Sequence, residues 1–214
     1  DSQFNIPLNF TERFGLPNGE GIRRTVSFRQ GVGGYAGTRD TYLDATDLDG
    51  RHGSDAIAWV DRDRDGNTSG QQPAHALLRF ESIFGPGGIP AGAVIESAEL
   101  ILHTSELADS QSPNTMGIYR VLKGWTVNAT WNSQTNGISA NASDALFAPD
   151  SEVVPNVRGG YVSFDVTASL SAWAAGAPNH GWALLPGGAN GWRWDTSEAT
   201  YPLFRPLLNV TYRF

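Results

Sequence analysis

The stretch YVSFDVTASLSAWAAGAPNHGWALLP, residues 161–186, decides the fold class. Its first residues alternate, and the apolar set on one side is Val162, Phe164 and Val166. This alternation is typical of a β-strand with one buried face. The following TASLSAWAA predicts one short helix near Thr167–Ala175, with Thr167 as N-cap, Gly176 as C-terminal stop and Pro178 blocking continuation. The stretch therefore predicts strand, helix and strand, with Trp173 buried.

Outward from this stretch, the sequence reads as short strands joined by turns. Downstream, RPLLNVTYRF (205–214) alternates again. Further strand-like runs precede it at Thr25–Gln30, Thr38–Asp44, Ala56–Val60, Ala74–Glu81, Val94–His103 and Thr115–Leu122, and two more lie at Gly181–Leu185 and Leu207–Arg213. Their spacing and the glycine- and proline-rich turns predict an all-β, antiparallel β-sandwich with one short helix.

Length and composition narrow the class of protein. The chain has 214 residues, and we expect an irregular N-terminal segment (1–24) packed on a single β-sandwich domain (25–214). It has no cysteine, which argues against a disulfide scaffold and excludes a thiolate metal site. The net charge of −7, without a basic run, predicts no nucleic-acid partner. No apolar run is long enough to cross a bilayer, so no membrane partner is expected.

A series of motifs carries a family resemblance. The matching stretches, in order, are SFRQGVGGYAGTRDTYLDA (27–45), HALLRFESIFG (75–85), IPAGAVIESAELILHT (89–104), KGWTVNATWNS (123–133), FDVTASLSAWAAGAPNHGWALLP (164–186), TSEA (196–199) and RPLLNVTY (205–212). Taken together the chain resembles the DNRLRE-type domains, a group of secreted β-sandwich modules. Glu81 departs from the family pattern, where Asp often follows LLRF.

The resemblance implies a jelly-roll-like sandwich in a secreted, extracellular protein. Members of this family accompany secreted enzymes and surface proteins, and some are carbohydrate-binding modules that attach to alginate. The implied function is a non-catalytic carbohydrate-binding or attachment module whose partner is a polysaccharide. Other surface proteins, or a catalytic domain of a larger parent protein, are the further partners implied.

The segment DRDRDGN, residues 61–67, is the strongest candidate for a metal site. Three carboxylates at alternate positions and a glycine that permits a sharp turn can converge on calcium, which prefers oxygen ligands. We expect a structural Ca²⁺ site formed by Asp61, Asp63, Asp65, Asn67 and Ser69. Position twelve of this loop is Gln72 and no helices flank it, so it is not an EF-hand. A second acidic cluster (Asp44, Asp47, Asp49) is a possible source of further ligands, and a solvated acidic turn is the alternative.

Tryptophans in two irregular regions are candidates for sugar contacts. Exposed indoles stack on sugar rings, and a neighbouring arginine can bind hydroxyls, which makes Trp192, Arg193 and Trp194 a candidate ligand site. Trp125 and Trp131, in the long irregular segment 123–154, could extend it. The alternative is that these residues belong to the core, because sandwich cores use tryptophan freely. Burial of the four indoles would favour that alternative.

No motif selects a catalytic set. The sequence has no G-x-S-x-G, H-E-x-x-H or glycine-rich phosphate loop, and its four histidines lack metal-ligand spacing. A glycosidase needs only two carboxylates, but nothing in the sequence selects a pair. Two alternatives therefore stay open beside the binding module: a structural or adhesive surface module that acts through protein partners, and a small polysaccharide-cleaving enzyme.

Overall fold

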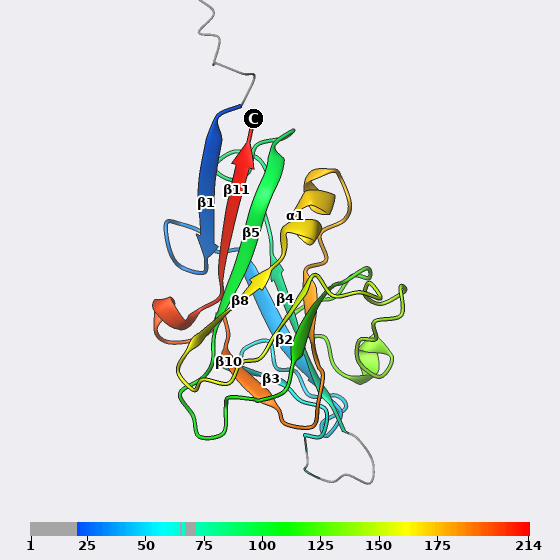
Figure 1. Ribbon diagram of the computed structural model, residues 1–214. Helices are drawn as coiled ribbons and strands as arrows, with labels where there is room; N and C mark the ends of the chain where they lie inside the picture. Colours follow the sequence, from blue (N-terminus) through cyan, green and yellow to red (C-terminus); the bar gives the residue numbers. More distant parts are fainter. Residues whose placement is uncertain (1–20, 65, 67–71) are drawn as a thin grey trace, which may run out of the picture.

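The computed structural model describes residues 21–64, 66 and 72–214. Within them the chain is mostly β, with strands connected by loops, two single 3₁₀ turns and one short α-helix (Figure 1). The strands are β1 (Arg23–Arg29), β2 (Thr38–Asp44), β3 (Ile57–Val60), β4 (Ala74–Phe80), β5 (Val94–His103), β6 (Met116–Arg120), β7 (Ser151–Val153), β8 (Tyr161–Asp165), β9 (Trp182–Pro186), β10 (Trp192–Asp195) and β11 (Leu207–Arg213). The predicted all-β antiparallel sandwich is confirmed.

Two antiparallel sheets face each other. One has the order β1-β11-β5-β8, and the other has the order β2-β4-β9-β6-β7. Without the edge strand β2 and the ribbon β3–β10, the remaining eight strands alternate between the sheets as in a jelly roll, except that the consecutive strands β6 and β7 share one sheet. This alternation brings β1 next to β11 and β4 next to β9, although both pairs are far apart in sequence.

A short two-stranded ribbon stands apart from both sheets. β3 pairs with β10, and the register places Trp59 opposite Arg193 and Ile57 opposite Asp195. The ribbon is tied to the four-stranded sheet by an isolated bridge between Thr104 and Trp194. It therefore closes the end of the sandwich that lies away from the chain's C-terminus (Figure 1).

Alternating residues of both sheets form one hydrophobic core. Leu100, Phe164, Leu208 and Val210 come from the four-stranded sheet, and Leu78, Phe80, Ile118 and Leu184 from the five-stranded sheet. All eight are fully buried. Such burial contributes about 1.5–3 kcal/mol for each large side chain.

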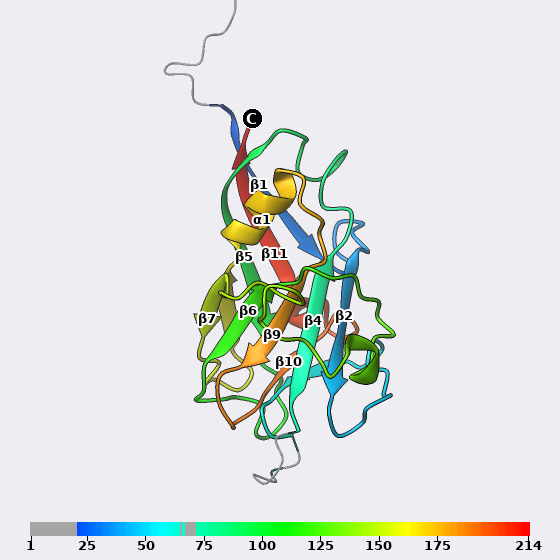
Figure 2. The ribbon, with the colours of Figure 1, turned by 90° about the vertical axis from the view of Figure 1, so that its right-hand side faces the viewer.

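The outer face of the five-stranded sheet is covered by the long segment 122–150. Figure 2 shows this green segment crossing in front of β9 and β4. A second apolar cluster fills the space between them, with Leu43, Leu77 and Ala183 from the sheet and Trp125 and Trp131 from the segment. The segment is therefore a packed cover of the sheet, despite its irregular backbone.

The helix α1 (Thr167–Ala174) forms where it was predicted, and Trp173 is buried against Trp182. The predicted N-cap is wrong by one residue, because the cap position is Val166. The Thr167 hydroxyl accepts the Ala98 N–H instead, and the Asp165 carboxylate accepts the Thr167 N–H. No helix among the described residues is long and apolar enough to span a membrane.

Other boundaries differ slightly from those predicted. β7 and β10 were not predicted as strands, and β1 begins at Arg23, inside the segment that was expected to be irregular. The rest of that segment, residues 1–20, lies outside the described residues. Short strands such as β7 and β10 carry too few alternating positions for the sequence pattern to detect.

Candidate functional site

The β3–β10 ribbon has one face in the core and one face toward solvent. Trp192 and Trp194 on β10, with Ala58 and Val60 on β3, are fully buried. The alternate positions point outward and are half-buried; they are Ile57 and Trp59 on β3, and Arg193 and Asp195 on β10. The pleat of each strand thus presents a row of chemically different side chains at the outer surface.

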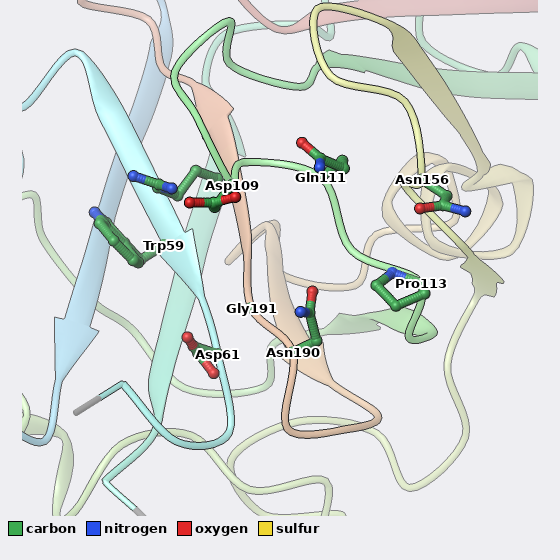
Figure 3. A pocket seen from close by; sticks show the side chains of 9 residues that line it. Trp59, Asp61, Asp109, Gln111, Pro113, Asn156, Asn190 and Gly191 are labelled. Carbon is green, nitrogen blue, oxygen red and sulfur yellow. The ribbon is translucent and has the colours of Figure 1, made fainter. Parts of the chain in front are cut away.

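A polar pocket opens at one end of this outward row. Its volume is about 170 Å³. Figure 3 shows the side chains around it, which come from β3 and the residue after it, from the segment after β5, from the loop between β7 and β8, and from β10 and the loop before it. The lining residues are Trp59, Asp61, Asp109, Gln111, Pro113, Asn156, Asn190, Gly191 and Arg193. Carboxylates, amides and one guanidinium therefore surround a single indole, which is a donor and acceptor set suited to sugar hydroxyls.

Two arginines hold the indole of Trp59. The Arg64 guanidinium carbon lies 3.3 Å from the centre of the ring, and that of Arg193 lies 4.5 Å from it. Arg64 is fixed in turn by the Asp44 carboxylate at 3.1 Å. Arg193 donates to the Ala108 carbonyl, and its burial lowers the pKa of the guanidinium. Cation–π contacts of this kind stabilise and orient both partners.

Asp61 forms the inner wall of the pocket. Its Oδ1 accepts the Asp63 N–H at 2.9 Å, and its other oxygen lies against Gly191. A Cβ at position 191 would lie 2.2 Å from that oxygen, so the close approach requires glycine. Burial raises the pKa of Asp61, although the Asp63 N–H and Arg64 oppose the shift. The carboxylate is thus held in place and partly dehydrated, ready to accept hydrogen bonds.

Two buried polar atoms at the pocket have no hydrogen-bond partner among the described residues. They are Oε1 of Gln111 and Nε of Arg193. An acceptor and a donor left in this way cost about 1–3 kcal/mol each, and buried groups of proteins are usually paired. Gln111 and Arg193 both line the same hollow, so a ligand bound there would lie beside both side chains.

The five predicted sugar-binding residues fall into two groups. Trp125 and Trp131 lie in the cluster under segment 122–150, with 5% and 8% of their surface exposed, and Trp192 and Trp194 are fully buried in the main core. Their burial favours the alternative in which the four indoles are core residues. Arg193 is the one member of the set that lines the pocket.

The predicted calcium ligands are only partly described. Asp65, Asn67 and Ser69 lie outside the described residues. Asp61 faces the polar pocket, and Asp44 of the second acidic cluster binds Arg64. In that cluster, Asp49 accepts a hydrogen bond from Asn132 at 3.0 Å. The part of the chain that the structure describes contains no group of three His, Cys, Asp or Glu residues placed to hold a metal ion.

Sequence reasoning missed most of the polar pocket. Asp109, Gln111, Asn156 and Asn190 lie in loops that come together only in the folded chain. One signal was available: Ile57 and Trp59 alternate with Ala58 and Val60, so one face of that strand carries an indole toward solvent. The loop residues have no such pattern.

Comparison with known families agrees with the geometry. The model of carbohydrate-binding module family 96 matches residues 34–212 of the chain. The match includes β2 to β10, all of β11 but its last residue, and the whole lining of the polar pocket. No curated protein matches the chain significantly.

Proposed function

The chain belongs to carbohydrate-binding module family 96, and from this we propose that it binds a polysaccharide at the polar pocket beside the β3–β10 ribbon. A sugar ring presents hydroxyls at its edge and C–H groups on its faces. The pocket offers amide and carboxylate groups around an indole that is fixed by Arg64 and Arg193. Its shape and chemistry are those expected of a small site for a polar ligand.

The observation that carries this assignment is the pair of unpartnered atoms. Gln111 Oε1 accepts hydrogen bonds and Arg193 Nε–H donates them, so the hydroxyl groups of a sugar offer the complementary partners. Asp61, whose Oδ1 accepts the Asp63 N–H, adds a second acceptor to the lining through Oδ2. A ligand that forms these hydrogen bonds removes the free-energy cost of leaving the buried groups without partners.

Affinity gel electrophoresis tests the proposal. The gels contain alginate, polygalacturonate, xylan, mannan or mixed-linkage glucan, and we expect retardation on at least one of them. Asn190→Ala, at an exposed pocket position, should reduce the retardation, whereas Asn128→Ala, at an exposed position on the covering segment, should leave it unchanged. No retardation on any gel, or equal retardation of both variants, would contradict the assignment.

We also propose that the module attaches rather than cleaves. Its place is in a secreted, extracellular protein, beside a catalytic domain of a larger parent, as the resemblance to DNRLRE-type domains implies. Two carboxylates, Asp61 and Asp109, line the polar pocket. Glycosidases use such a pair, so the alternative that the chain cleaves polysaccharide can be tested at these residues. Incubation with the retained polysaccharide should release no new reducing ends; release that is lost in Asp109→Asn would establish an enzyme.

A structural calcium ion stays part of the proposal. Its support is the sequence DRDRDGN (61–67), which contains Asp61, Asp63, Asp65 and Asn67 and is followed by Ser69. Calcium that binds only the folded chain raises the melting temperature. We expect a higher melting temperature in calcium than in chelator, and the difference should vanish in Asp63→Ala. If neither calcium nor chelator changes the melting temperature, the calcium proposal is wrong and the segment is a solvated acidic turn.

A further inference from the structure

A second pocket lies on the same side of the β3–β10 ribbon. Its volume is about 220 Å³. Ile57 and Asp195, the outward residues at the other end of the ribbon, line it together with Phe204. Most of the remaining lining is apolar or weakly polar, and comprises Ala56, Ser105, Glu106, Leu107, Ala199, Thr200 and Tyr201. We refer to it as the apolar pocket.

The two pockets share both of their flanking elements. On the ribbon, Trp59 and Arg193 line the polar pocket, and the next outward pair, Ile57 and Asp195, lines the apolar pocket. Outward residues on one strand are about 6.6 Å apart, because the chain rises about 3.3 Å per residue. On the other flank, the single segment 105–113 contributes Leu107 to one pocket and Asp109 to the other.

Arg193 joins the two flanks between the pockets. Its backbone accepts the Ser105 N–H at 3.0 Å and donates to the Ser110 carbonyl at 2.9 Å. Its guanidinium donates to the carbonyl of Ala108, the residue between Leu107 and Asp109. The segment is therefore fixed along the ribbon, and the two pockets are neighbours on one surface.

Two aromatic rings line the apolar pocket, the exposed Tyr201 and the packed Phe204. Tyr201 is 66% exposed and meets Phe204 edge to face at 5.5 Å. Phe204 stacks in turn on His103 at 4.0 Å, and His103 is buried and lies 2.6 Å from the Asp195 carboxylate. Phe204 is thus fixed in place before any ligand binds, while the Tyr201 ring is open to solvent. A ring with a free face and a fixed edge suits the C–H face of a sugar.

We propose that the polar and apolar pockets are two subsites of one groove that binds an internal stretch of a linear polysaccharide. The polar pocket takes the hydroxyl groups of one sugar, and Tyr201 stacks on a sugar further along the chain. This inference rests on the proposed function and extends it. From Asp61 to Ile57 the ribbon spans about 13 Å, which is longer than a single sugar ring, so the groove selects oligosaccharides over monosaccharides.

Calorimetric titration with oligomers of the polysaccharide retained in the gels tests the groove; for alginate these are its di-, tetra- and hexasaccharides. Affinity should rise at least about tenfold from disaccharide to hexasaccharide, because the longer chain reaches the second subsite. Tyr201→Ala should remove most of that gain and leave disaccharide binding unchanged, whereas Tyr201→Phe should retain it. Phe147→Ala, which removes a 79% exposed ring on the covering segment, is the matched control and should have no effect.

The outcomes separate the two proposals. No binding of any polysaccharide overturns the proposed function and this inference together. Binding with the same affinity for all three lengths, or an equal effect of Tyr201→Ala on all three, overturns the groove and leaves the polar pocket as a single site. A peptide or protein that competes at Tyr201 while oligosaccharides do not would also overturn it. Melting temperatures of the Tyr201 variants close to that of the wild type confirm that each variant is folded.

Discussion

The covering segment 122–150 and the β3–β10 ribbon both carry two of the predicted sugar-binding tryptophans, and both bury them, but they differ in what they leave at the surface. In the covering segment, polar side chains pair with other groups of the same segment. Lys123 binds the Asp144 carboxylate at 2.8 Å and the Gln134 carbonyl at 3.1 Å. At the ribbon, Gln111 Oε1 and Arg193 Nε are buried without a partner among the described residues.

Tryptophan content therefore does not locate the binding surface. An indole contributes mainly by burying a large apolar area, and both regions use it in that way. Where polar groups are already paired within the protein, as Lys123 is in the covering segment, a ligand adds few favourable hydrogen bonds. The ribbon has unmet hydrogen bonds around a hollow, so its free energy falls when a ligand supplies them.

The largest effect should come from Trp194→Ala. Trp194 is fully buried in the main core, and loss of a large aromatic ring there costs about 3–5 kcal/mol. Denaturant unfolding should show this loss together with loss of polysaccharide binding. Trp125→Ala should instead loosen the covering segment, with faster amide exchange in residues 122–150 and unchanged affinity. Loss of affinity in folded Trp125→Ala would contradict the division between the two regions.

The second effect is a pH dependence that comes from the covered side. His75 lies beside Trp131, accepts the Ile138 N–H, and burial lowers its pKa to about 4. The unfolded chain, with a histidine pKa of about 6.5, binds the proton more readily, so stability is full above pH ~6.5 and is lost as pH falls toward ~4. The loss is at most about 3 kcal/mol.

Unfolding free energies measured across this window should decline in the wild type and much less in His75→Gln. The ribbon contributes with the opposite sign, because burial raises the pKa of Asp61 and Asp195. A carboxyl with a raised pKa is most favourable to folding at low pH, and this contribution is lost as pH rises through the folded-state pKa. An equal decline in wild type and His75→Gln would show that His75 does not cause it.

Much of the fold could be predicted because its signals are local. The alternation in Val94–His103 and Leu207–Arg213 gave both strands their observed bounds, and the stop at Gly176 and Pro178 placed the helix. The cover of the five-stranded sheet could not be predicted, because segment 122–150 has no period. What holds it is contact between Trp125 and Trp131 and residues distant in sequence, such as Leu77 and Ala183.

Of the residues predicted to contact a sugar, only Arg193 lies in the candidate site. WRWD reads equally well as two exposed tryptophans around an arginine or as two buried ones, since alternation does not say which face is inside. The Thr104–Trp194 bridge to the four-stranded sheet settles that direction, and it joins residues far apart in the chain. Asp109, Gln111, Asn156 and Asn190 come from loops, whose meeting depends on the completed sandwich.

The third prediction concerns Gly191, whose backbone lies against the Asp61 carboxylate in the polar pocket. In Gly191→Ala the new Cβ would lie 2.2 Å from an oxygen of Asp61, so the carboxylate must move. We expect a loss of about 1–3 kcal/mol in stability and a clear loss of affinity. Gly124→Ala, on the covering segment, is the matched control, because its Cβ meets nothing closer than 4.0 Å. Unchanged affinity in Gly191→Ala would show that Asp61 does not contact the ligand.

The smallest effect, and the one that separates the two regions best, is expected for Gln111→Met. The substitution keeps the length of the side chain and removes a buried acceptor that has no partner among the described residues. Stability should therefore stay unchanged or rise by up to about 1 kcal/mol, because an unsatisfied buried group is a cost. Affinity should fall, since the ligand loses the same acceptor. Opposite signs in denaturant unfolding and in calorimetric titration are the mark of a group kept for binding rather than for folding. A parallel loss of stability and affinity would instead place Gln111 among the residues that hold the sandwich together, as Lys123 holds the covering segment.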